Sequence, residues 1–242
     1  MGEVRLDDAV ERALGELRAA IEAGFRSERR RDPLTGLQNL FALDEWLDQS
    51  IAGACWVAFV EVDKFKSINE RFGYDNADQF LKLVASCLAV TAERNQGVAF
   101  RAHGDEFYLA ASTPEPIDSG AVQALLEELA DWIKALPLSV SHDGETRTLS
   151  GTVSIGWLDT SDVEGEVGRS ELKTKLEIAM AEAKKNRGST IRWLPTMKRP
   201  EMSSHRDDCT ACGCKFSFDV PSTVSRAVIV CPVCHVELRT LT

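Results

Sequence analysis

The residues best suited to chemistry in this chain are two groups of carboxylates. Asp105 and Glu106 lie in a short polar stretch between residues 98–102 and 107–111, two apolar runs that the sequence predicts as β-strands. Because so few residues separate the runs, we expect a tight hairpin in which Gly104 supplies the permissive backbone. The two adjacent carboxylates would then stand at a rigid tip.

A second acidic group, Glu61 and Asp63, follows the apolar run at residues 55–60. Side chains alternate across a strand, so these two carboxylates share one face. If the predicted strands are neighbours, three or four carboxylates converge at one end of a sheet, where their repulsion is unfavourable unless a cation is bound. Oxygen ligands suit Mg²⁺ or Mn²⁺. Read alone, a solvated acidic hairpin explains the stretch equally well.

Six segments around these carboxylates match, in order, the motifs of one known family. They are residues 32–39, residues 61–74, Asp78, residues 103–107, residues 154–156 and residues 179–187. Together they resemble the GGDEF family of diguanylate cyclases over roughly residues 32–194, with His103 in place of the first signature glycine. The resemblance implies an α+β fold, the ferredoxin-like palm with a central antiparallel sheet and flanking helices. The predicted β-α-β-β-α-β order also indicates this palm.

The same resemblance implies a metal-dependent nucleotidyl cyclase. Such an enzyme condenses two purine nucleoside triphosphates, with GTP favoured, into a cyclic dinucleotide such as cyclic di-GMP and releases pyrophosphate. One palm holds one triphosphate, so a homodimer is expected for catalysis. The resemblance implies that Glu61, Asp105 and the Val62 carbonyl hold Mg²⁺ or Mn²⁺, with Glu106 beside them. The expected catalytic residues are Asp105, Glu106 and Glu61.

Substrate recognition is expected from a further set of residues. Asn69 and Asp78 match the family's guanine-reading positions, where an amide and a carboxylate together satisfy a guanine edge. Read alone, both residues are explained as caps or turns of the helix that begins near Asn76. Lys184 matches the family's triphosphate-binding lysine. The other expected substrate-binding residues are Lys66, Arg101, His103 and Arg187.

Several positions depart from the family pattern. Glu61 stands where aspartate is usual, His103 where glycine is usual, and Tyr74 where histidine is usual. The inhibitory-site motif retains Arg94 but has Gly97 in the acidic position. These differences leave a second hypothesis open, in which a catalytically degenerate GGDEF domain acts as a nucleotide-binding or protein-interaction regulator.

Composition and charge exclude some other classes. With 242 residues, 44% hydrophobic and 27% charged, the chain is long enough for one α/β domain and an appendage. No apolar run approaches the ~20 residues of a membrane helix, and the first residues lack the apolar core of a signal peptide. We therefore expect a cytoplasmic protein with no membrane partner. The formal charge of −10 disfavours non-specific nucleic-acid binding by the large domain.

Four parts are expected along the chain. They are residues 1–31, an N-terminal helix and possible dimer stalk; residues 32–194, the GGDEF-like domain; residues 195–208, a linker; and residues 209–242, a small zinc ribbon. The stalk's seam of Val10, Leu14, Leu17 and Ile21 spans only about two heptads, so it could equally pack on its own domain. Within the large domain we expect helices over residues 40–50, 76–94, 120–136 and 171–187, and a hairpin over residues 138–156 that turns at Asp143-Gly144.

The C-terminal part carries two CxxC pairs eighteen residues apart, formed by Cys209, Cys212, Cys231 and Cys234. Four thiolates in this spacing are typical of a structural Zn²⁺ site. Cys214 and His235 lie close by, but the paired spacing is complete without them. Zinc held by four thiolates has no open coordination position, so the ribbon is expected to mediate association and not chemistry. Residues 195–242 hold six Lys/Arg against five Asp/Glu and few aromatics, so the expected partner is protein rather than nucleic acid.

The spacing of these cysteines predicts one zinc ion per chain. Metal analysis of the purified protein should find one equivalent, and changing Cys209→Ser and Cys212→Ser together should remove it, because two thiolates are lost. Cys87→Ala is the matched control, since Cys87 is expected in the apolar core and should leave the zinc content unchanged. Full zinc content in the double variant would contradict the assignment.

Overall fold

The computed structural model describes residues 14, 16, 18, 29–50, 53–114, 116–142, 144–163, 168–198, 202–221, 227–230, 233 and 237–241. It divides into two compact units, Met1–Pro195 and Thr196–Thr242. None of the helices in the described ranges has the length and hydrophobicity that a membrane span requires. Of the predicted N-terminal seam only Leu14 is described, so the dimer stalk lies largely outside the described residues.

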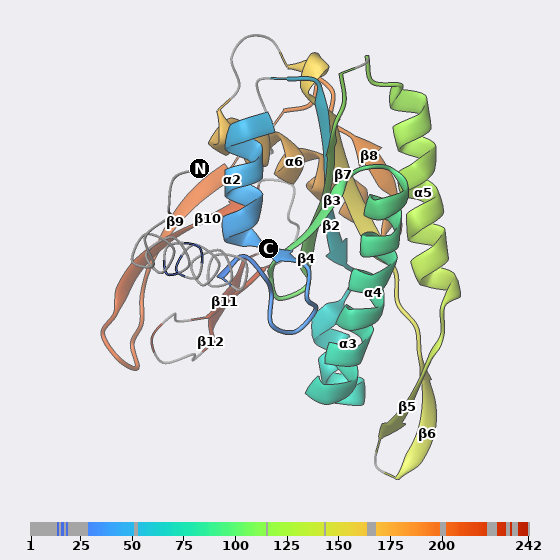
Figure 1. The fold of residues 1–242 in the computed structure, drawn as a ribbon. Coiled ribbons are helices and arrows are strands. Elements are labelled where there is room, and N and C mark those ends of the chain that lie inside the picture. The colour runs from blue at the N-terminus through green and yellow to red at the C-terminus, as the bar shows by residue number, and fades with distance from the viewer. Residues whose placement is uncertain are drawn as a thin grey trace, which may run out of the picture. The chain divides into compact units, whose positions relative to one another are not determined.

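A six-stranded sheet forms the centre of the first unit, in the order β1-β3-β4-β2-β7-β8 (Figure 1). Its strands are β1 (Gln38–Asn39), β2 (Cys55–Val62), β3 (Val98–His103), β4 (Glu106–Ser112), β7 (Val153–Asp159) and β8 (Thr190–Arg192). The four central strands pair antiparallel, as the palm fold predicts. The edge strands β1 and β8 pair parallel with their neighbours, so the sheet is mixed and not antiparallel throughout.

The middle position of β2 explains its composition. This strand lies between β4 and β7, and residues 55–60 and Val62 are all buried. A strand that is covered on both faces has an almost continuous apolar sequence instead of an alternating one. Only Glu61, next to the end of the strand, is half-buried. The prediction of a central buried strand is confirmed.

Helices α4 and α5 cover one face of the sheet, and α2 and α6 cover the other (Figure 1). The described helices of this unit are α2 (Leu40–Ser50), α3 (Phe65–Phe72), α4 (Tyr74–Arg94), α5 (Ser119–Ala135) and α6 (Arg169–Ala183). Helix α6 connects β7 to β8, and a crossover of this kind is what parallel neighbours require. The sequence did not predict α3. It also extended α6 to residue 187, whereas a 3₁₀ turn, Lys184–Asn186, follows Ala183.

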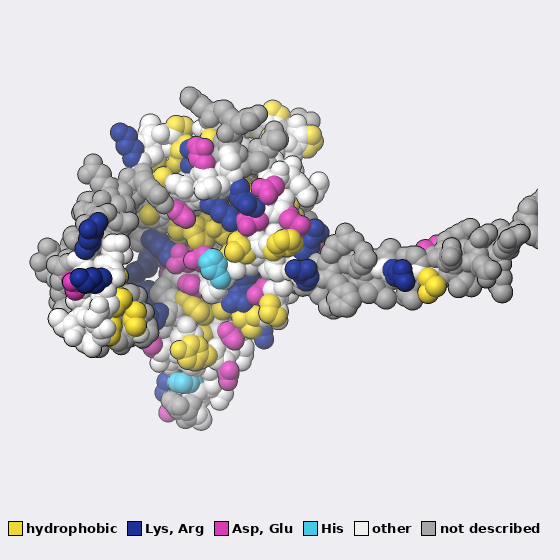
Figure 2. Space-filling view, turned by 90° about the vertical axis from the view of Figure 1, so that its left-hand side faces the viewer, with side chains coloured by type: hydrophobic (Ala, Val, Ile, Leu, Met, Phe, Trp, Pro, Cys, Tyr) yellow, Lys and Arg dark blue, Asp and Glu magenta, His cyan; other side chains and the backbone are white. Residues whose placement is uncertain are grey.

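Ion pairs link the two helices on the second face. Lys173 and Arg169 of α6 lie 2.5 and 3.7 Å from Asp44 of α2. Figure 2 shows acidic and basic side chains interspersed on one side of the molecule. Exposed pairs contribute only about 0–1 kcal/mol each. The complete burial of Leu43 and Leu47 therefore holds α2 more strongly than these charges do.

Residues 138–156 do not form the single hairpin that the sequence predicts. β5 (Leu138–His142) and β6 (Glu145–Leu149) pair as a separate two-stranded sheet, with Gly144 at a φ of +77° between them. The following strand, β7, pairs with β2 in the main sheet instead. The small hairpin is fixed to α4 because the Asn76 side-chain amide donates to the Ser141 carbonyl oxygen at 2.9 Å.

The described residues of the second unit form two antiparallel strand pairs. β9 (Met202–Asp208) pairs with β10 (Lys215–Pro221), and β11 (Ala227–Val230) pairs with β12 (Glu237–Leu241). The sequence placed residues 202–208 in the linker, but their backbone pairs with β10 along the whole strand.

A tight turn carries the first cysteine pair of this unit. The Cys209 N–H donates to the Cys214 carbonyl oxygen at 2.8 Å, and the Gly213 N–H donates to the Cys209 carbonyl oxygen at 2.7 Å. Cys231 and Cys234 lie outside the described residues, so the predicted four-thiolate site does too. Within the described ranges, no group of three or more His, Cys, Asp or Glu side chains is placed to hold a metal ion.

Gly156 of β7 marks the closest approach of α6 to the sheet. A Cβ on Gly156 would touch the Met180 backbone nitrogen and lie 2.8 Å from the Ala179 carbonyl carbon. We predict that Gly156→Ala lowers the free energy of unfolding by about 1–3 kcal/mol in urea titrations, because two backbones must separate. Gly53→Ala is the control, since a Cβ there meets only the Ser50 carbonyl oxygen at 3.6 Å. Equal stability of the two variants would contradict this account.

Candidate active site

The acidic hairpin forms between β3 and β4. His103 and Glu106 are paired across the strands, so Gly104 and Asp105 make up the turn. Gly104 takes a φ of +54°, a left-handed conformation that favours glycine. Nε and Nη2 of Arg101 donate to the Gly104 carbonyl oxygen at 3.0 and 2.7 Å. The predicted tight hairpin is confirmed, with Asp105 at its tip.

Strands β2 and β4 bring the two acidic groups together. Glu61 lies opposite Glu106 in the strand register, and the Val62 N–H donates to the Asp105 carbonyl oxygen at 3.2 Å. These contacts confirm that the two predicted strands are neighbours. The carboxylates of Glu61, Asp105 and Glu106 therefore converge at one end of the sheet, as the sequence predicts.

Asp63, directly after β2, belongs to the scaffold. Its buried carboxylate accepts hydrogen bonds from Thr152 Oγ1 at 2.6 Å and from Ser154 Oγ at 2.7 Å. The Asp63 N–H also donates to the Thr152 carbonyl oxygen at 2.9 Å. Asp63 thus ties the end of β2 to the start of β7, and its charge is not offered to a ligand.

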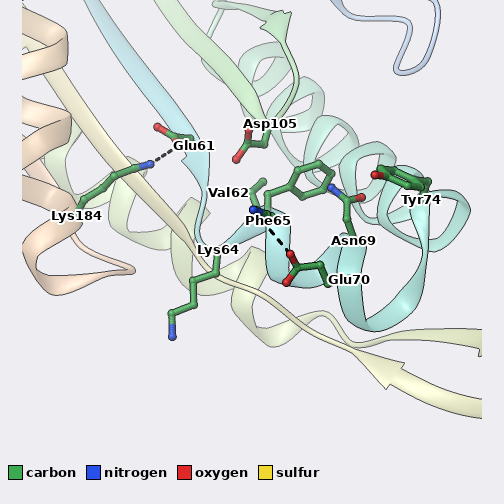
Figure 3. Close-up of a pocket in the computed structure, with 10 residues that line it drawn as sticks. Glu61, Val62, Lys64, Phe65, Asn69, Glu70, Tyr74, Asp105 and Lys184 are labelled. Carbon is green, nitrogen blue, oxygen red and sulfur yellow. Dashed lines mark hydrogen bonds and ion pairs between the residues drawn. The ribbon is translucent and has the colours of Figure 1, made fainter. Parts of the chain in front are cut away.

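A cavity of about 560 Å³ opens beside the acidic hairpin (Figure 3). The residues that line it are Glu61, Val62, Lys64, Phe65, Lys66, Asn69, Glu70, Tyr74, Asp105 and Lys184. Six of them are predicted site residues, namely Glu61, Val62, Lys66, Asn69, Asp105 and Lys184. The predicted residues that do not line it are Asp78, Arg101, His103, Glu106 and Arg187. The sheet, α3, the start of α4 and the chain after α6 therefore meet at one concave site.

Lys184 forms an ion pair with Glu61 at one side of the cavity (Figure 3). Lys184 directly follows α6 and lies 123 positions from Glu61 in the sequence. Its ammonium group supplies the positive charge that crowded carboxylates need. This contact could not be predicted, because the two residues meet only in the tertiary structure.

Glu106 differs electrostatically from its neighbours. Burial raises the pKa of the Glu106 carboxyl group. The charge of His103 lowers this pKa, and the negative charges of Glu61 and Asp105 raise it further. His103 Nε2 lies 3.3 Å from Glu106 Oε2, and the His103 side chain is 66% exposed. His103 therefore contacts Glu106 beside the cavity and does not line it.

Helix α3 supplies one wall of the cavity. The residue before it, Lys64, takes a φ of +53°, which is uncommon for a side chain other than glycine. Lys66 is 90% exposed, and its ammonium lies 3.9 Å from Glu70. Lys64 and Glu70 are not among the predicted site residues, because their type and spacing on a short polar segment carry no specific signal.

Comparison with known proteins identifies the family. The family model described as "Diguanylate cyclase, GGDEF domain" matches residues 29–190. The chain belongs to the GGDEF family. Diguanylate cyclase DgcP of Escherichia coli is 30% identical over 202 residues, which are 79% of this chain and 54% of DgcP. An uncharacterized protein of Mycobacterium tuberculosis is 34% identical over 180 residues, which are 73% of this chain and 27% of that protein. The chain thus spans about a quarter of the length of the mycobacterial protein and about half of the length of DgcP.

Solved structures share the fold of this GGDEF chain. The coiled coil and GGDEF domain of DgcB from Caulobacter crescentus, in complex with c-di-GMP, gives a TM-score of 0.64 at 22% identity and covers 78% of this chain and 98% of that one. Diguanylate cyclase SiaD from Pseudomonas aeruginosa, in complex with its activator SiaC, gives a TM-score of 0.63 at 24% identity. This match covers 76% of this chain and 69% of the SiaD chain.

The divalent cation that a GGDEF cyclase implies fits the donors at this end of the sheet. Glu61, Asp105 and the Val62 carbonyl line one cavity and offer only oxygen, the donor type that Mg²⁺ and Mn²⁺ prefer. Mg²⁺ commonly uses one or two carboxylates together with waters and substrate phosphates. A site with few protein ligands is therefore chemically sufficient.

The inhibitory-site motif of the GGDEF family is altered in its packing as well as in its sequence. Arg94 is the last residue of α4, and Gly97 directly precedes β3. A Cβ at Gly97 would lie 2.7 Å from the Ala110 carbonyl oxygen. An acidic side chain at this position therefore does not fit on the present backbone.

Arg101 has a structural role, and the substrate contact predicted for it stays a prediction. Its Nη1 donates to both carboxylate oxygens of Asp32 at 2.9 and 3.1 Å, and its side chain is only 11% exposed. Thr35 donates to the same carboxylate through its N–H and its hydroxyl. Burial acts to raise the pKa of Asp32, but the hydrogen bonds from Thr35 and Arg101 outweigh it and hold the pKa below its usual value.

We predict that Asp32→Asn lowers the free energy of unfolding by about 2 kcal/mol at pH 7, because the Arg101 charge then lacks its partner. A lowered pKa in the folded state means that the Asp32 carboxylate stabilises the protein fully above the unfolded-state value near 3.8 and loses this contribution as the pH falls through the folded-state value. The difference between variant and wild type should therefore shrink below pH 3.8 in urea titrations. A cycle with Arg101→Met tests the pair, and additive losses would contradict coupling.

Proposed function

We propose that this chain is a metal-dependent nucleotidyl cyclase that joins two purine nucleoside triphosphates, with GTP favoured, into a cyclic dinucleotide such as cyclic di-GMP and releases pyrophosphate. The observation that carries the proposal is the gathering of Glu61, Asp105, Asn69 and Lys184 around one cavity. Membership of the GGDEF family supports it, as does the name of the relative DgcP, a diguanylate cyclase.

The proposed reaction forms each phosphodiester bond by substitution at phosphorus. The 3′-hydroxyl oxygen of one nucleotide attacks the α-phosphorus of the other, and the bond to pyrophosphate breaks. A bound Mg²⁺ or Mn²⁺, held by Glu61, Asp105 and the Val62 carbonyl, would supply Lewis-acid stabilisation of charge on the α-phosphate. Glu106, which lies opposite Glu61 in the strand register and next to Asp105 in the chain, is the proposed acceptor of the hydroxyl proton.

Cationic and amide side chains would hold the triphosphate in place. Lys184 pairs with Glu61, and a divalent cation at Glu61 would leave its ammonium group to the phosphates. Lys66 is exposed at the cavity and can approach phosphate oxygens. Asn69 would read the edge of the base. Asp78, His103 and Arg187 stay predicted contacts for parts of the nucleotide beyond the cavity lining.

Two copies of the chain are needed for this reaction, because one cavity provides one set of ligands. We therefore propose a homodimer in which each protomer holds one triphosphate and the reacting groups meet between them. The predicted N-terminal helix, residues 1–31, would help to hold the two GGDEF domains, residues 32–194, together.

The remaining parts of the proposal concern the C-terminal residues. A linker within residues 195–208 would lead to a zinc ribbon, residues 209–242, with Zn²⁺ held by Cys209, Cys212, Cys231 and Cys234. The tight turn from Cys209 to Gly213 supports it, because it brings the first two cysteines close together. The ribbon would contact protein and take no part in the chemistry.

A regulator that binds a nucleotide without turnover is the second candidate. The Glu61–Lys184 ion pair favours it, because Lys184 neutralises the carboxylate to which a metal ion would bind. His103 favours it too, since this side chain contacts Glu106 at the place where the family has glycine.

Purified protein with GTP and Mg²⁺ or Mn²⁺ should release pyrophosphate and form a cyclic dinucleotide that chromatography resolves. Asp105→Asn should reduce the rate by more than about 100-fold, because loss of outer-shell metal partners alone costs about 10- to 100-fold. Asp131→Asn, an exposed position on α5, is the control and should leave the rate unchanged. Tight GTP binding by the wild type without turnover of any triphosphate pair would instead support the regulator.

A further inference from the structure

Tyr74 is the most exposed large apolar side chain among the described residues, with 78% of its surface accessible. It lines the same cavity as Asn69, the predicted reader of the base edge. In Figure 3 both residues lie at the end of the cavity away from the Glu61–Lys184 ion pair. The proposed mechanism leaves Tyr74 without a role.

The backbone around Tyr74 fixes its position. Gly73 takes φ and ψ of +79° and 162°, a conformation essentially limited to glycine, and Tyr74 is the first residue of α4 after it. The Gly73 N–H donates to the Asn69 carbonyl oxygen at 2.9 Å, so the turn closes between Asn69 and Tyr74. The buried Asn76 amide anchors the first turn of α4 to the Ser141 carbonyl oxygen. The backbone that carries the exposed ring is therefore held in place by these hydrogen bonds.

The Tyr74 side chain makes no hydrogen bond and no ring contact within the part of the chain that the structure describes. An aromatic face left in water forgoes the free energy that burial of its apolar surface would give. Nucleobases are suited to such a face, because each base has a π-face that stacks on aromatic side chains. Asn69 can satisfy only the edge of a base and leaves its faces open.

We propose that Tyr74 stacks on the purine base whose edge meets Asn69, which makes it a substrate-binding residue. This inference rests on the proposed cyclase function. Stacking does not distinguish one purine edge from another. Tyr74 therefore contributes affinity for the base, while Asn69 contributes the choice between bases.

The test measures equilibrium binding and not turnover. Calorimetry of the full chain uses guanosine 5′-(α,β-methylene)triphosphate with Mg²⁺, because this analogue cannot release pyrophosphate. Tyr74→Ala should raise Kd about tenfold, within the range known for base–aromatic contacts. Tyr74→Phe keeps the ring and should bind like wild type. Tyr74→Leu keeps apolar volume without a π-face and should bind nearly as weakly as the alanine variant.

The controls separate stacking from other roles of an exposed ring. Thermal unfolding of the three variants should match wild type, because a side chain that is 78% exposed adds little to the core. Wild-type affinity in Tyr74→Ala would overturn the inference. A loss of affinity that follows a loss of self-association, measured by sedimentation at the same concentrations, would overturn it too, because Tyr74 would then be a contact between protomers. If the wild type does not bind the analogue at all, the proposed function itself is wrong.

Discussion

The register between β2 and β4 is the constraint on which the candidate site depends. It places Glu61 opposite Glu106, and the Val62 N–H holds the turn that carries Asp105. A slip of one residue would turn every side chain of β2 to the opposite face of the sheet. Because β2 is buried between β4 and β7, the packing of its apolar residues specifies where the carboxylates lie. Their repulsion is then reduced by the ammonium group of Lys184.

Features set by short stretches of sequence could be predicted, and those set by tertiary packing could not. The two-residue turn at Gly104 follows from the few residues between two apolar runs, and the central place of β2 follows from its continuous apolar sequence. Helix α3 escaped prediction because only Ile68 and Phe72 of its eight residues are buried, which is too few to show a period. The partner of β7 could not be predicted either, since strand pairing is a long-range property.

The candidate site shows the same division. Sequence motifs named the residue types that line the cavity, but they could not separate charges that face a ligand from charges that hold the scaffold. Asp63 and Arg101 have motif positions as suggestive as that of Asp105, yet their polar atoms are occupied by Thr152, Ser154, Asp32 and the Gly104 carbonyl. Arg101 holds the acidic hairpin and Asp63 holds the end of β2, whereas the Asp105 carboxylate has no hydrogen bond or ion pair within the described part of the chain.

The packing at Gly97 also restricts how this sequence can evolve. Every side chain other than that of glycine has a Cβ, and a Cβ at position 97 would collide with the Ala110 carbonyl oxygen. Even alanine would therefore destabilise the fold there. A single mutation could therefore not introduce an acidic residue at this position without a shift of β4. Such a shift would disturb the strand that carries Glu106. The backbone thus keeps position 97 for glycine.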